Sequence, residues 1–166
     1  MGGHSSAPSL YSKLPYDTLK DFAPVMMVAG SPMVLIANPV HNVRTLPQLI
    51  ELAKNKPGSL NYASSGSGAI THLGMVRVMR MSGIDMAHVP FRGAGPAAIA
   101  VLENSVQVAS VALAAAEGLV RDGQLKALAV TGEKRWFSFP DVPTMIEAGY
   151  PGFVSDTFNA LFAPAG

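Results

Sequence analysis

Short strand-like segments alternate with amphipathic helical segments along most of this chain, and this alternation constrains the fold more than any other feature. Strands that alternate with helices over short links pair into a mostly parallel sheet, with helices on both faces. The sequence therefore predicts an α/β fold of this kind. We expect helices at residues 45–56, 70–81, 96–102 and 112–122, and strands at residues 60–63, 85–91, 107–111 and 125–130.

The loops at one edge of this sheet are the expected location of a site. Right-handed crossovers place the carboxyl ends of parallel strands at the same edge, and ligands of open α/β sheets bind there. The loops concerned are residues 64–68, 91–95, 112–115 and 131–134.

The two ends of the chain have a less regular pattern. Pro8 and Pro15 predict loop with little regular structure over residues 1–20. The Gly-Ser-Pro sequence at 30–32 separates two apolar segments, which we expect to form separate buried strands. These strands cover residues 22–29 and 33–37, and nearer the carboxyl terminus we expect one or two helical turns at 144–148 and an extended apolar segment at 153–162.

Composition excludes several classes of function. A net charge of +1, from 12 basic and 11 acidic residues, argues against nucleic acid or an anionic membrane as a partner. The absence of cysteine excludes disulfides and thiol catalysis. Four scattered histidines predict no metal site, and nothing in the chain indicates a cofactor. The longest apolar run, residues 25–37, is interrupted and too short to span a bilayer.

The Ser- and Gly-rich loop at 64–68, called the anion loop below, joins a predicted strand to a helix that begins near Ala69. The first N–H groups of a helix have no partner within it, and the helix dipole makes this end positive. Such a loop suits a carboxylate or a phosphate. Ser64, Ser65, Ser67 and Thr71 add hydroxyl groups, and Gly66 and Gly68 let an anion approach the backbone closely.

The loop also has other interpretations. It fits an ordinary strand-to-helix turn with a serine cap. It also fits an α/β enzyme, or a phosphate- or nucleotide-binding module. However, residues 66–71 lack the third glycine of a dinucleotide fingerprint and the lysine of a phosphate-binding loop. A loop serine with His72 as base lacks an orienting carboxylate, so we expect no catalytic residue. A third alternative is a fragment that assembles through apolar edges.

Six motifs agree in order and spacing with one known family. They are Leu14-Pro15-Tyr16-Asp17 with Leu19-Lys20-Asp21-Phe22-Ala23-Pro24-Val25; Leu60-Asn61-Tyr62-Ala63-Ser64-Ser65-Gly66 with Thr71-His72-Leu73; His88-Val89-Pro90-Phe91-Arg92-Gly93 with Pro96-Ala97; Leu125-Lys126-Ala127-Leu128-Ala129-Val130-Thr131; Asp141-Val142-Pro143-Thr144 with Glu147-Ala148-Gly149 and Pro151-Gly152; and Leu161-Phe162-Ala163-Pro164-Ala165-Gly166. From about Leu10 to Gly166 the chain resembles the tripartite tricarboxylate transporter receptors, which are Bug-type extracytoplasmic solute-binding proteins.

This resemblance implies a fold and a function. The fold would be a lobe of the type II periplasmic-binding-protein kind. The function would be non-catalytic capture of a small carboxylate in the periplasm for membrane transporter subunits. The resemblance also implies that the chain is a fragment that covers mainly the second lobe. Residues 1–24 would belong with a missing first lobe, residues 25–135 would form the second lobe, and residues 136–166 would return toward the first.

Candidate ligand-binding residues follow from the resemblance and from the local pattern. The resemblance assigns Ser64, Ser65, Gly66, Ser67, Gly68 and Thr71 to the carboxylate site. His72 is either an imidazole near that carboxylate or a partly buried side chain bonded to backbone, and His88 is expected to be structural. Arg92, followed by Gly93, either pairs with a ligand carboxylate or braces a loop.

Two further sequence features bear on ligand choice and assembly. Gln107 and Val111 stand where the family often has acidic residues, which puts a family contact with a ligand amine or hydroxyl in doubt. Residues 112–116 lack side chains that could select a ligand. Exposed strands at 25–37 and 153–162 would allow two copies to pair as a homodimer.

Overall fold

The computed structural model describes residues 2–165, and the side chains of residues 6–165. Its elements, in chain order, are α1 (Gly2–Leu10), β1 (Phe22–Ala37), the 3-10 helix η1 (Pro39–His41), α2 (Leu46–Asn55), β2 (Asn61–Ser64), α3 (Ile70–Ser82), β3 (Ala87–Pro90), α4 (Ala94–Leu102), β4 (Val108–Ala112), α5 (Leu113–Arg121), β5 (Lys126–Val130) and β6 (Asp156–Pro164). None of these described helices has the length and apolar character needed to cross a bilayer.

The sheet has the strand order β3-β2-β4-β1-β5, and β6 pairs with β1 beyond this path. β2 is parallel to β3 and β4, whereas β1 is antiparallel to both β4 and β5. It follows that β2, β3, β4 and β5 run in one direction and β1 alone runs against them. The prediction of a mostly parallel sheet is confirmed. The antiparallel strand inside it was not predicted.

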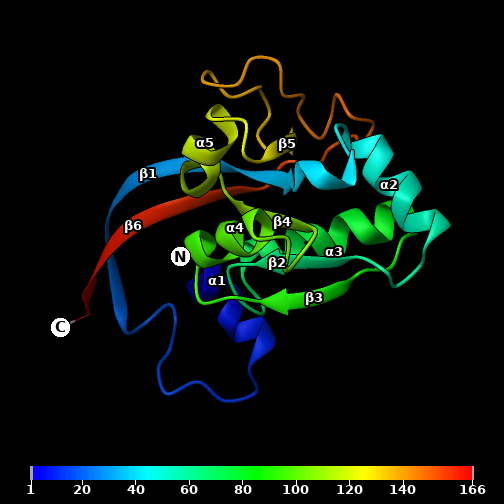
Figure 1. Ribbon diagram of the computed structural model, residues 1–166. Coiled ribbons are helices and arrows are strands. Elements are labelled where there is room, and N and C mark those ends of the chain that lie inside the picture. The colour runs from blue at the N-terminus through cyan, green and yellow to red at the C-terminus, as the bar shows by residue number, and fades with distance from the viewer. Residues whose placement is uncertain (1, 166) are drawn as a thin grey trace.

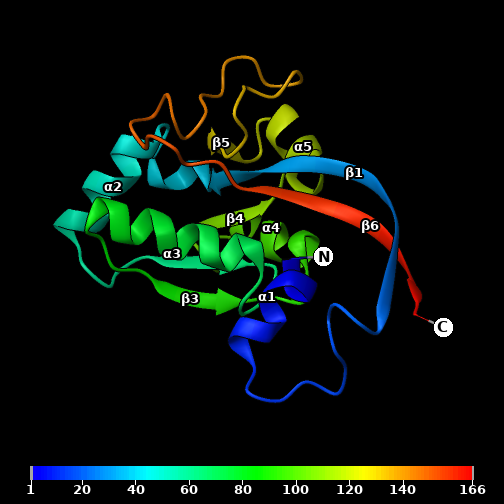
Figure 2. The same ribbon diagram turned by 180° about the vertical axis from the view of Figure 1, so that it is seen from behind.

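Helices cover both faces of the sheet, as expected. α2 and α3 supply Leu49 and Met75 to the core on one face. α4 and α5 supply Val101 and Leu113 to the core on the other. Figure 1 shows α4 in front of the sheet, and Figure 2, from behind, shows α3 in front of it. Because side chains alternate along β1, Leu35 packs into the first core and Ile36 into the second.

The prediction of two buried strands before residue 38 is wrong. β1 is one strand of 16 residues, and it passes through the Gly-Ser-Pro sequence without a break. β6 explains this continuity, because Gly30 pairs with Phe158 and Ser31 with Thr157. Only Pro32–Ala37 is buried, since the strand enters the lobe after Ser31. The earlier part forms with β6 a two-stranded ribbon that projects from the lobe (Figure 1).

Three smaller predictions also need correction. Residues 2–10 form α1 rather than a loop, and Ala7 of this helix is buried. α4 begins at Ala94, so that Pro96 is its third residue and not its first. The apolar segment expected at 153–162 starts with Phe153, which is a core residue outside β6.

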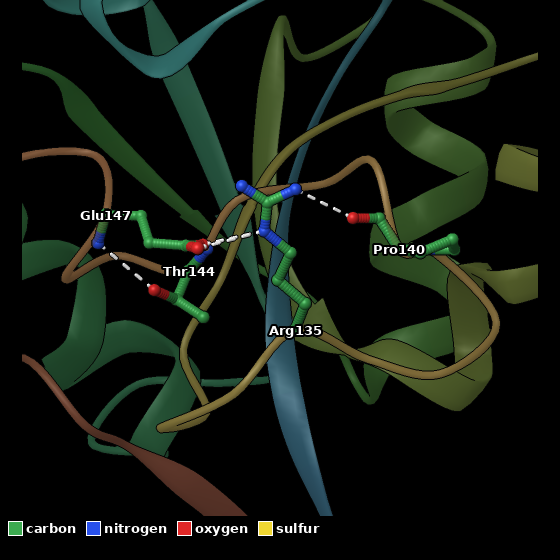
Figure 3. A network of polar contacts seen from close by, with 4 residues as sticks. All are labelled: Arg135, Pro140, Thr144 and Glu147. Atoms are coloured by element: carbon green, nitrogen blue, oxygen red, sulfur yellow. Dashed lines mark hydrogen bonds and ion pairs between the residues drawn. The ribbon is translucent and has the colours of Figure 1, made fainter.

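Residues 144–148 form a single turn and not a helix. Ala148 N–H donates to the carbonyl oxygen of Thr144 at 3.0 Å. The side chains of Thr144 and Glu147 form a capping box around this turn. In this box Thr144 N–H donates to a Glu147 carboxylate oxygen, and Glu147 N–H donates to Thr144 Oγ1. Arg135 pairs with the same carboxylate and donates to the Pro140 carbonyl (Figure 3). Side chains thus order this long connection between β5 and β6.

Candidate functional site

A cleft of about 600 Å³ lies at the carboxyl-terminal edge of the parallel strands. Its lining comprises Ser31, Ser65, Gly66, Ser67, Ala69, Ile70, Thr71, Ala94, Ala112, Ala114, Thr157, Phe158 and Asn159. Three of the four loops expected at this edge therefore meet there. The loop at 131–134 does not line the cleft. Its Thr131 is fully buried, and Thr131 Oγ1 accepts from Met33 N–H at 2.9 Å.

Three helix N-termini meet at this cleft without side-chain caps. The N-cap residues of α3, α4 and α5 are Ala69, Gly93 and Ala112, and none of them makes a side-chain cap hydrogen bond. At the opposite edge Thr45 caps α2 with its own side chain. The first N–H groups of the three helices therefore lack an acceptor within their helices. Their dipoles also add positive potential at the cleft.

The anion loop is braced by hydrogen bonds from its own side chains. Thr71 Oγ1 accepts from Ser65 N–H at 3.1 Å and lies 2.7 Å from Ser65 Oγ. Gly66 N–H donates to the buried Ser64 Oγ at 3.2 Å. Ser67 N–H makes no hydrogen bond with any described residue, so it is free to meet a ligand. Of the predicted site residues, Ser65, Gly66, Ser67 and Thr71 line the cleft.

Ser64, Gly68 and His72 hold the loop from behind and do not line the cleft. Ser64 Oγ lies 2.7 Å from His88 Nε2, and Gly68 N–H donates to His72 Nδ1 at 3.0 Å. Gly68 has a φ of +73°, and a Cβ atom there would collide with the Leu10 side chain of α1. A side chain at this position is therefore strained by the backbone conformation, and the end of the Leu10 side chain would have to move to admit it.

Arg92 and Gly93 also lie outside the lining of the cleft. Arg92 is exposed and makes no hydrogen bond or ion pair within the part of the chain that the structure describes. Gly93 has a φ of +123° at the N-cap of α4, a conformation that favours glycine, and it leads into Ala94, which does line the cleft.

Sequence reasoning missed the contribution of the β1–β6 ribbon. Ser31, Thr157, Phe158 and Asn159 line the cleft from this ribbon. Ser31 Oγ lies 3.3 Å from Thr157 Oγ1, and the Phe158 side chain is 40% exposed. The available signal was the group of polar residues at 155–159 inside an otherwise apolar segment.

The described residues that line the cleft include no charged side chain. An anion there would be held by N–H groups, hydroxyl groups and the Asn159 amide. Gln107 and Val111 do not line it: Gln107 Oε1 accepts from Asn61 N–H at 2.9 Å, and Val111 is fully buried in the core. Ala112 and Ala114 present only methyl groups, in agreement with the prediction for 112–116.

Two other clefts lie away from these helix N-termini. One is lined by Arg44 and Lys126, together with residues near the end of α5. The other lies beside the carboxyl-terminal ends of α2 and α3 and includes Tyr150. Among the described residues there is no group of three or more His, Cys, Asp or Glu side chains that could hold a metal ion.

Comparisons with known proteins identify the family of the chain. The family model described as "Tripartite tricarboxylate transporter family receptor" matches residues 1–166. The chain is 36% identical to protein BugT of Bordetella pertussis, over 98% of this chain and 51% of BugT. The structure of the periplasmic binding protein BugD matches with a TM-score of 0.94 and 32% identity, over 99% of this chain and 55% of that one.

A ligand-bound structure is also similar. MatC of Rhodopseudomonas palustris, with bound malate, matches with a TM-score of 0.91 and 33% identity, over 99% of this chain and 56% of MatC. The chain thus spans about half the length of the relatives it matches.

Proposed function

Because the chain belongs to the tripartite tricarboxylate transporter receptor family, we propose that it forms the carboxylate-binding part of a periplasmic solute-binding receptor. In this role it captures a small carboxylate and passes it, chemically unchanged, to membrane transporter subunits. The malate in MatC and the periplasmic BugD support this proposal by similarity.

The observation that carries the proposal is the meeting of three uncapped helix N-termini at one neutral cleft. Unpartnered N–H groups are the donors that a carboxylate needs, and the helix dipoles favour its charge. Capping side chains would occupy these donors. α3, α4 and α5 lack such capping side chains, in contrast to α2, so their first N–H groups are available to a ligand.

The cleft suggests how a small dicarboxylate binds. One carboxylate accepts from Ser67 N–H and from the first N–H groups of α3, with Ser65 Oγ beside it. The hydrocarbon part of the ligand packs against Phe158 and the methyl groups of Ala112 and Ala114. Neutral donors suffice, because hydrogen bonds to an ionised acceptor are stronger than those between neutral groups.

The same cleft favours binding over catalysis and over nucleotide recognition. Ser64 lies beside His88, but Ser64 is fully buried and outside the cleft lining. A nucleotide would call for a lysine near its phosphates, and the described lining contains none. These features favour a receptor that binds its ligand without catalysing a reaction.

We also propose a division of the chain within a two-lobed receptor. Residues 25–135 form the body of the second lobe, against which Ala7 of α1 and also Met145 and Phe153 pack. The remaining parts of residues 1–24 and 136–166 lead to a first lobe that closes over the cleft. A micromolar receptor binds with about −8.2 kcal/mol, and half of this energy corresponds to a dissociation constant of about 1 mM. We expect this chain to bind its ligand at roughly that strength.

Isothermal titration of the chain tests this function. The panel is malate, succinate, citrate and glutamate, with ATP as a control anion. We expect millimolar binding of at least one carboxylate, and weaker binding in a Ser65→Ala/Ser67→Ala double variant, which loses two hydroxyl groups but keeps the backbone N–H donors. Binding of ATP more tightly than every carboxylate, or no carboxylate binding at millimolar concentration, would contradict the proposal.

A further inference from the structure

Two histidines hold the two ends of the anion loop, on the side away from the cleft. His88 Nε2 lies 2.7 Å from Ser64 Oγ, where the loop begins. His72 Nδ1 accepts from Gly68 N–H at 3.0 Å, where the loop ends. The two imidazoles stack with their centroids 4.0 Å apart and an interplanar angle of 12°. They come from β3 and α3, so that one stacked pair joins two elements to a single loop.

The two bonds respond differently to a proton. A backbone N–H can only donate, so His72 Nδ1 must carry a lone pair. A proton on Nδ1 would place an N–H group of His72 opposite the Gly68 N–H, and with no acceptor between them this hydrogen bond would break. The bond of His88 tolerates a proton, because Ser64 Oγ can accept from Nε2–H. Only the neutral form of His72 therefore holds Gly68 in place.

The surroundings of the stack favour the neutral form. Burial lowers the pKa of His72, and both burial and the charge of His72 lower the pKa of His88. Tyr62 of β2 stacks on both rings, and burial raises its pKa to about 12, so it adds no charge near neutral pH. α1 places Ser6 and Leu10 against Gly68, and neither side chain titrates. No described carboxylate forms an ion pair with either imidazole.

We propose that His72 is a positioning residue for the carboxylate site, which holds the anion loop in its binding shape only while its imidazole is neutral. His88 fixes the other end of the loop, and a proton on either imidazole opposes a proton on the other across the stack. This inference rests on the proposed function. It agrees with the interpretation of His72 as a partly buried side chain bonded to backbone, and not with direct contact between His72 and the ligand.

The two roles of His72 predict opposite effects of acid. A histidine that touches the ligand would gain a positive charge and tighten carboxylate binding as the pH falls. A histidine that positions the loop would release Gly68 and weaken binding. The sign of the pH dependence therefore separates the two roles.

The experiment measures malate affinity from about pH 7.5 to about pH 5, across the range where histidine titrates. We expect the wild-type affinity to fall by about three- to tenfold more on acidification than that of His72→Asn, the equivalent of one hydrogen bond. His72→Asn keeps an acceptor near the position of Nδ1 but does not titrate, so its affinity changes only with the protonation of malate itself, which is common to all variants. His72→Phe keeps a ring without an acceptor and binds weakly at every pH.

His41→Asn is the matched control. His41 Nε2 pairs with Asn104 Oδ1 at the opposite edge of the sheet, and this variant should follow the wild-type pH profile. Tighter malate binding at low pH, or wild-type affinity in His72→Phe, would overturn the positioning role.

The amide signal of Gly68 separates failure of this inference from failure of the proposed function. If malate binds at no pH, the proposed function fails, and the NMR shift of this amide alone decides the role of His72. A shift that follows the titration of His72 and disappears in His72→Asn supports the positioning role. A Gly68 amide signal that does not change with pH in the wild-type chain would overturn the positioning role of His72.

Discussion

Thr71 braces the anion loop through the hydroxyl group of its side chain. It is only 2% exposed, and its hydroxyl group meets both the N–H and the hydroxyl of Ser65. Thr71→Val keeps the shape of the side chain but leaves these groups without a partner. We expect the free energy of unfolding to fall by about 1–3 kcal/mol, measured by urea denaturation.

Thr71→Ser is the control for this prediction, because it restores the hydroxyl group and loses only a methyl group. We expect it to be more stable than Thr71→Val and to bind malate. Equal stability of the two variants would show that the hydroxyl group does not brace the loop.

The two stacked histidines also make the stability of the fold depend on pH. Their folded pKa values lie below the ordinary value of 6.5. The unfolded chain therefore binds protons more readily than the folded chain between these values. The stabilisation is fully present above pH 6.5 and is lost as the pH falls from there through the lowered values. Urea midpoints should decrease across this range, and a His72→Asn/His88→Gln variant should show a smaller decrease.

Local sequence was enough to predict some site residues and not others. Ser65, Ser67 and Thr71 line the cleft because a strand–loop–helix connection alone determines their place. The contact between Ser64 and His88 depends on the pairing of β2 with β3, which no local pattern encodes. The direction of His72 likewise depends on its stacking partner, so the sequence left open whether this imidazole meets a ligand or bonds to backbone.

At the scale of the element, the uncapped start of α3 predicts a conflict between stability and binding. Ala69 has the extended backbone of an N-cap residue but no side chain that can accept a hydrogen bond. Ala69→Asp would place a carboxylate on the free N–H groups and stabilise the fold by about 1 kcal/mol. The same carboxylate would compete with the ligand, so we expect loss of malate binding together with a higher melting temperature.

The cap of α2 provides the matched comparison. Thr45 Oγ1 accepts from Gln48 N–H at the edge opposite to the cleft. Thr45→Ala should cost about 1 kcal/mol of stability and leave malate affinity unchanged. If Ala69→Asp still binds malate like the wild type, the start of α3 is not part of the site.

The helices α2 to α5 and the strands β2 to β5 were predictable from local sequence, whereas α1 and the single long strand β1 were not. The apolar periodicity of α2 and α3 and the cap at Thr45 are local signals, and the structure agrees with them. β1 continues through its Gly-Ser-Pro sequence only because β6, more than 100 residues later, pairs with it. α1 contains Pro8 and packs against Gly68, so its helix is supported by tertiary contact and not by propensity.

At the scale of the whole molecule, the β1–β6 ribbon leaves apolar side chains exposed. Val25, Met26, Met27 and Val28 are each more than half exposed, and Leu161 of β6 is too. We propose that two copies of the chain pair through this ribbon as a homodimer. Sedimentation velocity should show a species of twice the monomer mass that Met27→Glu shifts toward the monomer. A wild-type chain that stays monomeric at high concentration would contradict the proposal.

The ribbon also explains why the loops at the carboxyl-terminal edge of the sheet were not enough to predict every residue of the site. Four residues of the ribbon line the cleft, although they lie outside the carboxyl-terminal loops of the sheet. General rules for α/β sheets point to those loops, and three of the four loops do meet there. The part supplied by the ribbon depends on how the chain enters and leaves the lobe.

A titration of the chain with malate, followed through its backbone amide signals, tests whether the carboxylate binds at the helix N-termini. We expect concentration-dependent shifts at Ser67, Ile70, Ala94 and Ala114, whose N–H groups lie at the loop and the three helix N-termini of the cleft. Shifts confined to Arg44 and Lys126, or to the cleft beside Tyr150, would place the anion elsewhere and contradict a carboxylate site at these helix N-termini.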